Sequence, residues 1–267
     1  ETAAALKLTE ADLLAKLTSI KAKLLEARAK RERPFLDTKI LTGWNGQMIA
    51  AFAKAGQVFN DKAAISAAVR AAEFLLAKLR NDEGRLLRTY GARPGEKPAA
   101  KINAFLDDYA FLLHGLLSLH DATGEKRWLD ESKVLADLMI RWYGDTDRGG
   151  FFFTAHDNEK LFARSKDSYD GAQPSGNGTA AQMLLTLARK TGEPRYRELA
   201  QKTLKQFVGV LKASPASAPA MALALDDFLG PDDKTPIKLD PLVPGTSGAK
   251  KPIKSEDVVK GEVKVRS

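Results

Sequence analysis

The 267-residue sequence contains no cysteine, and this absence removes three kinds of chemistry at once. Disulfides, thiol nucleophiles and thiolate metal sites are excluded, so redox chemistry cannot reside in this segment. Histidine is scarce, with three residues in the chain. His114 and His120 lack the i, i+4 spacing of a helical metal-binding pair, and His156 falls in an expected turn. We therefore expect no metal site and no cofactor.

Long apolar runs and a leader sequence are also missing. No run of about 18 apolar residues occurs, so we expect no membrane-spanning helix. The opening stretch, ETAAALKLTE, has no methionine, no basic n-region and no apolar h-region, so it shows no signal peptide. We interpret the chain as a soluble fragment of a longer protein, and the sequence leaves its compartment open.

The charge pattern excludes a further class of protein. The formal charge of +8 arises from 42 Lys and Arg against 34 Asp and Glu. A nucleic-acid-binding protein gathers such an excess into a basic stripe, whereas here acidic residues are mixed among the basic ones. The glycine-rich motifs that bind nucleotide phosphates are absent as well. The excess predicts a solvated surface and no nucleic-acid partner.

What the sequence does contain is a repeat of two-helix hairpins. Three segments share an apolar helix end, a glycine, a polar turn and a second amphipathic helix, and their glycines are Gly56, Gly124 and Gly192. Both separations between these glycines are 68 residues, so each unit is a helical hairpin followed by a long connector. Each glycine is expected to end its helix in the left-handed conformation.

Hydrophobic periodicity and capping signals place the helices. The expected ranges are 9–30, 44–55, 62–80, 106–122, 127–142, 178–190, 195–211 and 217–228. The connector that contains HDNE is predicted to be a β-hairpin with these four residues at its tip. Helical hairpins of constant period, with long connectors on one side, favour a toroid of which this chain supplies about four of six hairpins.

The predicted toroid ends near residue 230. We assign residues 1–230 to a partial α/α-toroid domain. Residues 231–267 are rich in proline and lysine and poor in large apolar groups, so they are predicted to be a linker or tail that leads to another module.

Polar clusters begin the first helices of the three hairpins. Their sequences are DTKILTGWNG, AFLDDYAF and DGAQPSGNG. Because the inner helices of a toroid run parallel, these clusters are expected to converge on one rim of a central cavity. The rim is therefore the candidate site.

Asp107 and Asp108 are the leading acid/base candidates, since adjacent carboxylates at a helix start cannot both be the cap. We predict that Asp108 projects into the cavity as general acid/base, with Asp170 or Asp37 as its carboxylate partner. Three alternatives stay open. These are a cap beside a solvated residue at 107–108, an ion pair between Asp37 and Lys39, and an Asx turn at Asp170.

Aromatic and amide side chains complete the predicted substrate-binding set. Trp44 and Tyr109 suit stacking on a sugar ring, with filling of the core as the alternative. The remaining candidates are polar residues of the same clusters, namely Lys39, Asn45, Ser175 and Asn177. Ser175 and Asn177 also suit helix caps.

Four motifs resemble those of a known family. RERPFLDTKILTGWNGQMIAAFAKAG, AFLDDYAFLLHGLLSLHDATGE, GGFFFTA and YDGAQPSGNGTAA are similar to motifs of the thioredoxin-domain-containing YyaL-like family, which includes the spermatogenesis-associated thioredoxin-like protein of animals. The resemblance spans about residues 8–230. It implies an N-terminal thioredoxin-like domain and an α/α toroid similar to six-hairpin glycosidases and to N-acylglucosamine 2-epimerase. This chain would be the C-terminal part of that toroid.

The resemblance also bears on the site. It carries over all the candidate residues above, together with Gly171, Pro174 and Gly176, whereas Thr38 and Gly178 depart from the family's aspartate and serine. The catalytic histidines of the epimerases have no counterpart here, so epimerase activity is disfavoured. The expected fold is all-α, an incomplete α/α toroid with a short β-hairpin insertion. The expected function is carbohydrate binding or processing, and the alternative is a non-catalytic scaffold that partners the thioredoxin-like domain.

Overall fold

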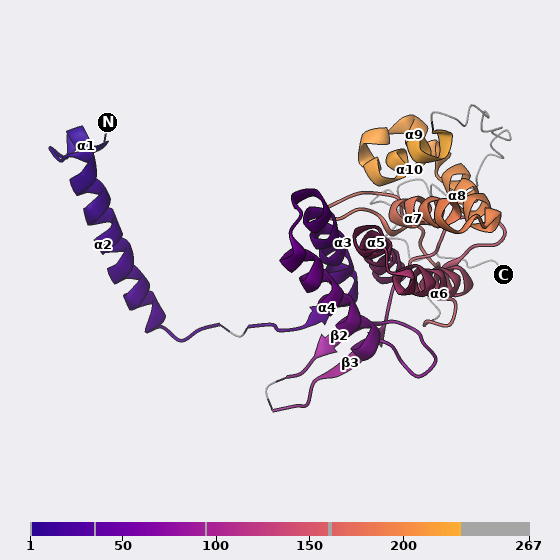
Figure 1. Cartoon of the computed structure of the whole chain (residues 1–267), viewed down its shortest axis with the longest axis horizontal. Coiled ribbons are helices and arrows are strands. Elements are labelled where there is room, and N and C mark those ends of the chain that lie inside the picture. Colours follow the sequence, from indigo (N-terminus) through magenta and orange to yellow (C-terminus); the bar gives the residue numbers. More distant parts are fainter. Residues whose placement is uncertain (1, 35, 94, 160–161, 231–267) are drawn as a thin grey trace, which may run out of the picture. The chain divides into compact units, whose positions relative to one another are not determined.

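The computed structural model of the protein describes residues 2–34, 36–93, 95–159 and 162–230 (Figure 1). The predicted tail at 231–267 lies outside the described residues. The chain divides into two compact units, one of Glu1–Ile40 with Tyr90–Ala99 and the other beginning with Leu41–Thr89 and continuing from Ala100. The second unit contains all the helical hairpins.

The first unit contains two helices, α1 (Thr2–Ala5) and α2 (Glu10–Ala29). Thr9 begins α2 as its N-cap, because its hydroxyl oxygen accepts a hydrogen bond from the backbone N–H of Asp12 at 3.1 Å. This start agrees with the predicted helix at 9–30.

Three helical hairpins and a terminal helix make up the second unit (Figure 1). The hairpins are α3 (Thr42–Phe59) with α4 (Lys62–Lys78), α5 (Leu106–Thr123) with α6 (Lys126–Tyr143), and α7 (Gly176–Thr191) with α8 (Pro194–Gln206). The short α9 (Val208–Ala213) and a 3₁₀ turn (Pro215–Ser217) lead to α10 (Pro219–Leu229). Helices α3, α5, α7 and α10 pack side by side in that order, and α4, α6 and α8 each pack on the first helix of their own hairpin. The predicted hairpin repeat is confirmed.

The inner helices all begin at the same end of the unit. The backbone N–H of Gly43 in α3 donates to Asp108 of α5 at 3.0 Å. Gly176 of α7 lies against Leu106 of α5, and α10 begins beside the loop that precedes α7, where the N–H of Ala220 donates to Asp170 at 2.5 Å. The predicted convergence of helix starts is therefore present in the second unit.

Two of the three repeat glycines end their helices as predicted. Gly124 (φ 71°) and Gly192 (φ 72°) are left-handed, a conformation that glycine adopts without steric cost. The prediction for Gly56 is wrong. Helix α3 continues one turn further, and Asn60 (φ 54°) takes the left-handed position. Gly56 lies inside the helix, where an added Cβ would be 2.4 Å from Ile65 of α4.

The strands also differ from the prediction. The structure has β1 (Ile40–Leu41), β2 (Leu87–Gly91) and β3 (Ala99–Asn103), in the sheet order β1-β2-β3. A β-hairpin insertion is thus present, but β2 and β3 lie in the connector between α4 and α5. Among the described residues of the HDNE connector there is an isolated bridge between Gly144 and Phe151 and no strand, so the hairpin predicted there is wrong.

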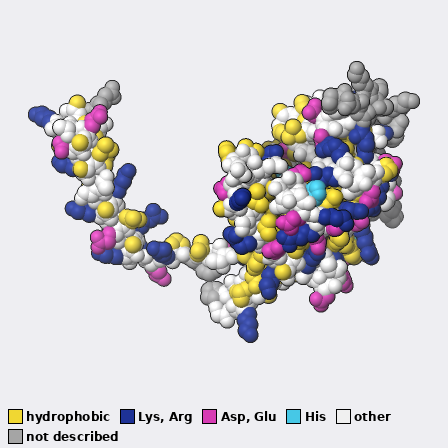
Figure 2. All heavy atoms as spheres, in the orientation of Figure 1, with side chains coloured by type: hydrophobic (Ala, Val, Ile, Leu, Met, Phe, Trp, Pro, Cys, Tyr) yellow, Lys and Arg dark blue, Asp and Glu magenta, His cyan; other side chains and the backbone are white. Residues whose placement is uncertain are grey.

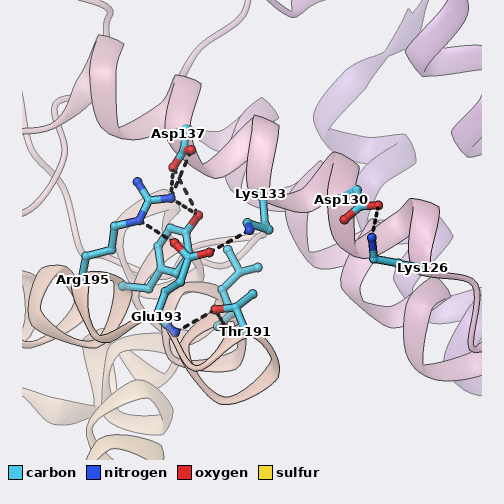
Figure 3. A network of polar contacts seen from close by, with 9 residues as sticks. Lys126, Asp130, Lys133, Asp137, Thr191, Glu193 and Arg195 are labelled. Carbon is cyan, nitrogen blue, oxygen red and sulfur yellow. Dashed lines mark hydrogen bonds and ion pairs between the residues drawn. The ribbon is translucent and has the colours of Figure 1, made fainter.

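Ion pairs join the outer helices α6 and α8 (Figure 3). Arg195 contacts Asp137 of α6 at 3.0 Å and Glu193 at 2.8 Å, while Lys133 of α6 contacts Glu193 at 2.8 Å. These side chains are partly exposed, so solvent screens each pair and the network mainly fixes the register of the two helices.

The distribution of charged side chains on the visible face agrees with the mixed pattern in the sequence. On the face that Figure 2 shows, basic and acidic side chains are interspersed over the helices of the second unit. Within the described part of the chain, no helix combines the length and apolar character needed to cross a membrane.

The contact between α3 and α5 gives a first testable prediction. A Cβ at Gly46 would lie 2.5 Å from the backbone nitrogen of Leu112 and 2.6 Å from the backbone carbon of Phe111, so Gly46→Ala would push the two helices apart. We expect it to lower the free energy of unfolding by at least about 2 kcal/mol in urea titrations.

Gly209→Ala is the matched control for this prediction. No described atom lies within 4 Å of the added Cβ, and Gly209 lies in a helix, so the substitution is expected to be neutral or slightly stabilising. Equal unfolding free energies for Gly46→Ala and the wild type would contradict the close packing of α3 on α5.

Candidate functional site

A cavity of about 240 Å³ lies where the starts of α5 and α7 meet. The described residues that line it come from α5, from α7 and from the connector between α6 and α7. They are Leu106, Asp107, Phe153, Asp167, Tyr169, Gly171, Ala172, Gln173, Ser175, Gly176 and Asn177. This cavity is the candidate active site.

Asp107 places a carboxyl group in the wall of the cavity from the second residue of α5. One oxygen accepts a hydrogen bond from Nε2 of Gln173 at 3.4 Å. The other lies so close to Gly176 that an added Cβ there would be 2.3 Å away. Gly176 is therefore required by the approach of this carboxyl group to the start of α7.

The surroundings of Asp107 raise its pKa to about 6. Burial is the largest cause, and the neighbouring charge of Asp108 adds to it, as does Asp167 in the same cavity. The charge of Arg88 and a backbone hydrogen bond from Gly176 act in the opposite direction. A carboxyl group with this pKa can both give and accept a proton near neutral pH.

Asp108 occupies a different environment from its neighbour. Its side chain is 2% exposed. One oxygen accepts from the N–H of Gly43 at 3.0 Å, and the other accepts from the N–H of Phe105 and from Arg88, each at 2.9 Å. Burial raises the pKa of Asp108, and these three donors oppose the rise.

The expectation that Asp108 faces the cavity therefore needs correction. Asp108 is the third residue of α5, and its carboxylate reaches back to accept a hydrogen bond from the backbone N–H of Phe105, the residue before the helix. Asp107, one position earlier, points to the cavity instead. The structure thus assigns the cap to Asp108 and the cavity wall to Asp107.

The loop that leads into α7 is held by its own polar side chains. Asp170 accepts from the N–H of Ser175 at 2.8 Å and from Ala220 of α10, and it is absent from the described lining of the cavity. Ser175 is the N-cap of α7, because its hydroxyl accepts from the N–H of Gly178 at 3.2 Å. The capping interpretation of Ser175 is confirmed.

Asn177 is buried, and its side chain binds the backbone of the connector instead of capping α7. Its side chain accepts from the N–H of Phe151 at 2.8 Å and donates to the carbonyl oxygen of the same residue at 2.9 Å. It also donates to the carbonyl oxygen of Asp167 at 2.9 Å. Asn177 thereby fixes two segments of the connector against α7.

Gly178 allows the close approach of α10. An added Cβ would lie 2.8 Å from the Cβ of Ala220 and 2.9 Å from the backbone nitrogen of Met221. The glycine that departs from the family pattern is therefore needed by the packing of this chain.

Tyr109 fills the core and does not stack in the cavity. Its side chain is 1% exposed, and its hydroxyl oxygen accepts from the N–H of Leu86 at 3.0 Å. Its ring packs against Tyr143 with centroids 5.3 Å apart. The prediction of a sugar-stacking platform is wrong for Tyr109, and the alternative of core filling holds.

Trp44 and Asn45 lie on α3, outside the described lining of the 240 Å³ cavity. Trp44 is 63% exposed. Asn45 donates to the carbonyl oxygen of Leu41 at 2.9 Å and borders a separate cavity of about 160 Å³ between α3 and α4, together with Met48 and Phe52. Their roles in binding a substrate stay predictions.

Asp37 and Lys39 belong to the first unit. Both side chains are exposed and form an ion pair at 2.9 Å. The side-chain hydrogen bond from Lys39 lowers the pKa of Asp37. These contacts fit the alternative of a local ion pair.

Three polar residues of the described lining were not singled out from the sequence, namely Asp167, Tyr169 and Gln173. Asp167 lies in a connector without regular secondary structure, where no periodic pattern marks a residue. Its carboxylate accepts from the N–H of Tyr169 at 2.9 Å, and its carbonyl oxygen is held by Asn177. The one sequence feature that could have identified Asp167 is its position in the same polar stretch as Asp170.

A larger cavity of about 520 Å³ lies at the other end of α7, between α8 and α10. Its charged lining includes Arg189 and Asp227, which pair with each other at 2.8 Å. We favour the smaller cavity because it lies at the starts of α5 and α7, where two polar clusters meet, and contains the Asp107 carboxyl group, whose pKa burial raises to about 6. Among the described residues, no group of three or more His, Asp or Glu is arranged to hold a metal ion.

Comparisons with known proteins place the chain among longer relatives. No protein-family model matches the sequence. The chain is similar to spermatogenesis-associated protein 20. It is 36% identical to the human protein and 34% identical to the mouse protein, each over 208 residues. The aligned region covers 76% of this chain and 26% of each of these relatives. An uncharacterized Caenorhabditis elegans protein is 32% identical over 225 residues. The chain thus covers about a quarter of the length of these relatives.

Solved structures with the same architecture are carbohydrate-processing enzymes. A family 76 α-mannanase of Bacteroides thetaiotaomicron aligns with a TM-score of 0.57 and 14% identity, over 75% of this chain and 54% of that chain. A family 105 glycoside hydrolase of C. acetobutylicum aligns at 0.52 and 11% identity, over 64% and 49%. At such identities the likeness shows the fold alone. The predicted α/α-toroid fold is confirmed.

Proposed function

We propose that this chain forms part of a toroid that binds and processes carbohydrate, with Asp107 as its proton donor. The observation that supports the proposal most directly is the half-buried carboxyl group of Asp107 in a cavity at the starts of two inner helices. Its raised pKa suits a general acid at neutral pH. The architecture, shared with carbohydrate-processing enzymes, gives a second and weaker line of support.

Cleavage of a glycosidic bond requires a proton on the leaving oxygen and a negative charge near the sugar carbon that becomes positive. In this proposal Asp107 gives its proton to the leaving oxygen, and the Asp167 carboxylate in the same cavity stabilises the positive charge. A water molecule then adds to the sugar carbon and releases a proton, which completes the hydrolysis. Gln173 holds one oxygen of Asp107 and orients the carboxyl group. Asp108 and Asp170, which the sequence favoured, act as structural supports of the site.

A second candidate function is supported by a different surface. Trp44, Met48 and Phe52 form an exposed apolar stripe along α3, at the four-residue spacing of one helix face. Such a face is usually covered by another element. A scaffold that packs against a thioredoxin-like domain, as the family resemblance implies, would use this stripe.

Titration with neutral oligosaccharides tests the proposal. We expect saturable binding of mannose- or glucose-based oligosaccharides by calorimetry, and release of smaller sugars that chromatography detects. The exposed substitution Asp130→Asn serves as a control and should change neither readout. The absence of both binding and product over a broad panel would contradict carbohydrate processing and favour the scaffold.

A further inference from the structure

Two acidic residues line the candidate cavity. Asp107 reaches it from α5 and Asp167 from the connector. Of the described residues that line the cavity, none is lysine, arginine or histidine. Within the described lining, a ligand therefore meets acidic side chains and no cationic one.

Three basic residues close to Asp107 or Asp167, by charge or by sequence, contact other partners, namely Arg88, Lys166 and Arg164. Arg88 pairs with Asp108 at 2.9 Å. Lys166 precedes Asp167 in the chain, but its amine contacts Asp145 at 2.5 Å and the carbonyl oxygen of Gly149 at 2.8 Å. Each side chain of the Lys166–Asp145 pair is nearly buried, so turning the lysine toward a ligand would leave Asp145 unpaired.

Arg164 also contacts groups outside the described lining of the cavity. Its Nε donates to the carbonyl oxygen of Thr154 at 3.2 Å, and its guanidinium lies 4.0 Å from the ring of Phe152. A phosphate or carboxylate in the cavity would thus find none of these three cations available.

We infer that the site selects uncharged sugars over sugar phosphates and uronates, and that Asp167 is the residue that sets this selectivity. The inference rests on the proposed function, because it names the substrate class of the same site. A like charge placed beside a fixed carboxylate discriminates against a ligand through repulsion.

Asp167 is assigned this role because its position is fixed and its side chain reaches solvent. The hydrogen bond from Tyr169 holds its carboxylate, and Asn177 holds its backbone. Asp107, in contrast, has a pKa raised to about 6 by burial, so only part of the Asp107 population is charged at the pH of the test. We therefore assign the selectivity to Asp167.

The test uses two pairs of ligands, each with one neutral and one anionic member built on the same sugar ring. Methyl glucoside with methyl glucuronide, and mannose with mannose 6-phosphate, are titrated into the protein at pH 6 and followed by calorimetry or by NMR chemical shifts. We expect the anionic member of each pair to bind at least about tenfold more weakly. Asp167→Asn keeps an oxygen that accepts from Tyr169, so it should narrow this ratio of affinities at least threefold, to roughly a third or less. Both affinities in the ratio are measured on the same variant, so a change that is common to both ligands cancels.

Asp147→Asn is the matched control. Asp147 is exposed in the same connector and is absent from the described lining of the cavity, so the change in net charge is the same and the ratio should stay unchanged. Equal or tighter binding of the anionic sugars would overturn the inference but not the proposed function. The same holds if Asp167→Asn leaves the ratio of neutral to anionic affinity unchanged. If neither member of either pair binds, the proposed function fails and the selectivity fails with it.

Discussion

Asp107→Asn is expected to lower the turnover of a glycoside substrate by about 10²- to 10⁴-fold while the fold stays intact. Asparagine has nearly the same shape and keeps an oxygen for the hydrogen bond from Gln173, but it cannot transfer a proton. Steady-state kinetics and circular dichroism of the purified variant measure the two effects separately. Turnover within about threefold of the wild type would exclude Asp107 as the proton donor.

The pH dependence of the same variant gives an independent check. The general acid works in its protonated form, so the wild-type rate should fall as the pH rises through about 6, the raised pKa of Asp107. The residual rate of the Asp107→Asn variant should not show this fall between pH 5 and 7. A wild-type profile that is flat between pH 5 and 7 would contradict the assignment.

The effect on stability has a definite sign. The folded pKa of about 6 lies above the unfolded value of about 3.9, so the folded state binds more protons between these pH values. The contribution of Asp107 to stability is therefore full below about pH 4 and is lost as the pH rises through 6. At pH 7.5 the Asp107→Asn protein should be at least as stable as the wild type in urea. A loss of activity in that variant then cannot be attributed to unfolding.

The helices were predictable because their signals are local. Amphipathic periodicity and the left-handed glycines at 124 and 192 mark helix bodies and ends without reference to the rest of the chain. Gly56 shows the limit of this approach. A glycine that ends a helix and a glycine that allows close packing inside a helix both follow an apolar pattern in the sequence. Only the packing of Ile65 of α4 on α3 shows that Gly56 is of the second kind.

The candidate site was predictable as a region but not in its details. The sequence places polar clusters at the helix starts, yet one residue of helix corresponds to a rotation of about 100°, so it cannot decide whether Asp107 or Asp108 faces the cavity. Tyr109 illustrates the same limit, since its burial depends on the loop that carries Leu86. The position of Asp167 depends on a hydrogen bond from Asn177, ten residues further along the chain, and such a bond leaves no periodic pattern in the sequence.

Asp108→Ala is expected to have the largest effect on stability, lowering the free energy of unfolding by about 3 to 4 kcal/mol. The substitution removes three charge-assisted hydrogen bonds and leaves the N–H of Gly43 buried without its acceptor. One of the three is the ion pair with Arg88, whose side chain is 31% exposed, so water compensates part of that loss. Urea unfolding at pH 7 measures the effect.

Two comparisons separate this effect from the loss of any surface charge. Asp130→Ala removes an exposed partner of Lys126 on α6 and should cost at most about 0.5 kcal/mol. Arg88→Met combined with Asp108→Ala should cost less than the sum of the single substitutions, because Arg88 then no longer lacks a partner. A cost for Asp108→Ala as small as that of Asp130→Ala would mean that Asp108 does not lock α3 to α5. The position of Asp107 in the cavity would then need another support, because the two carboxyl groups share the first turn of one helix.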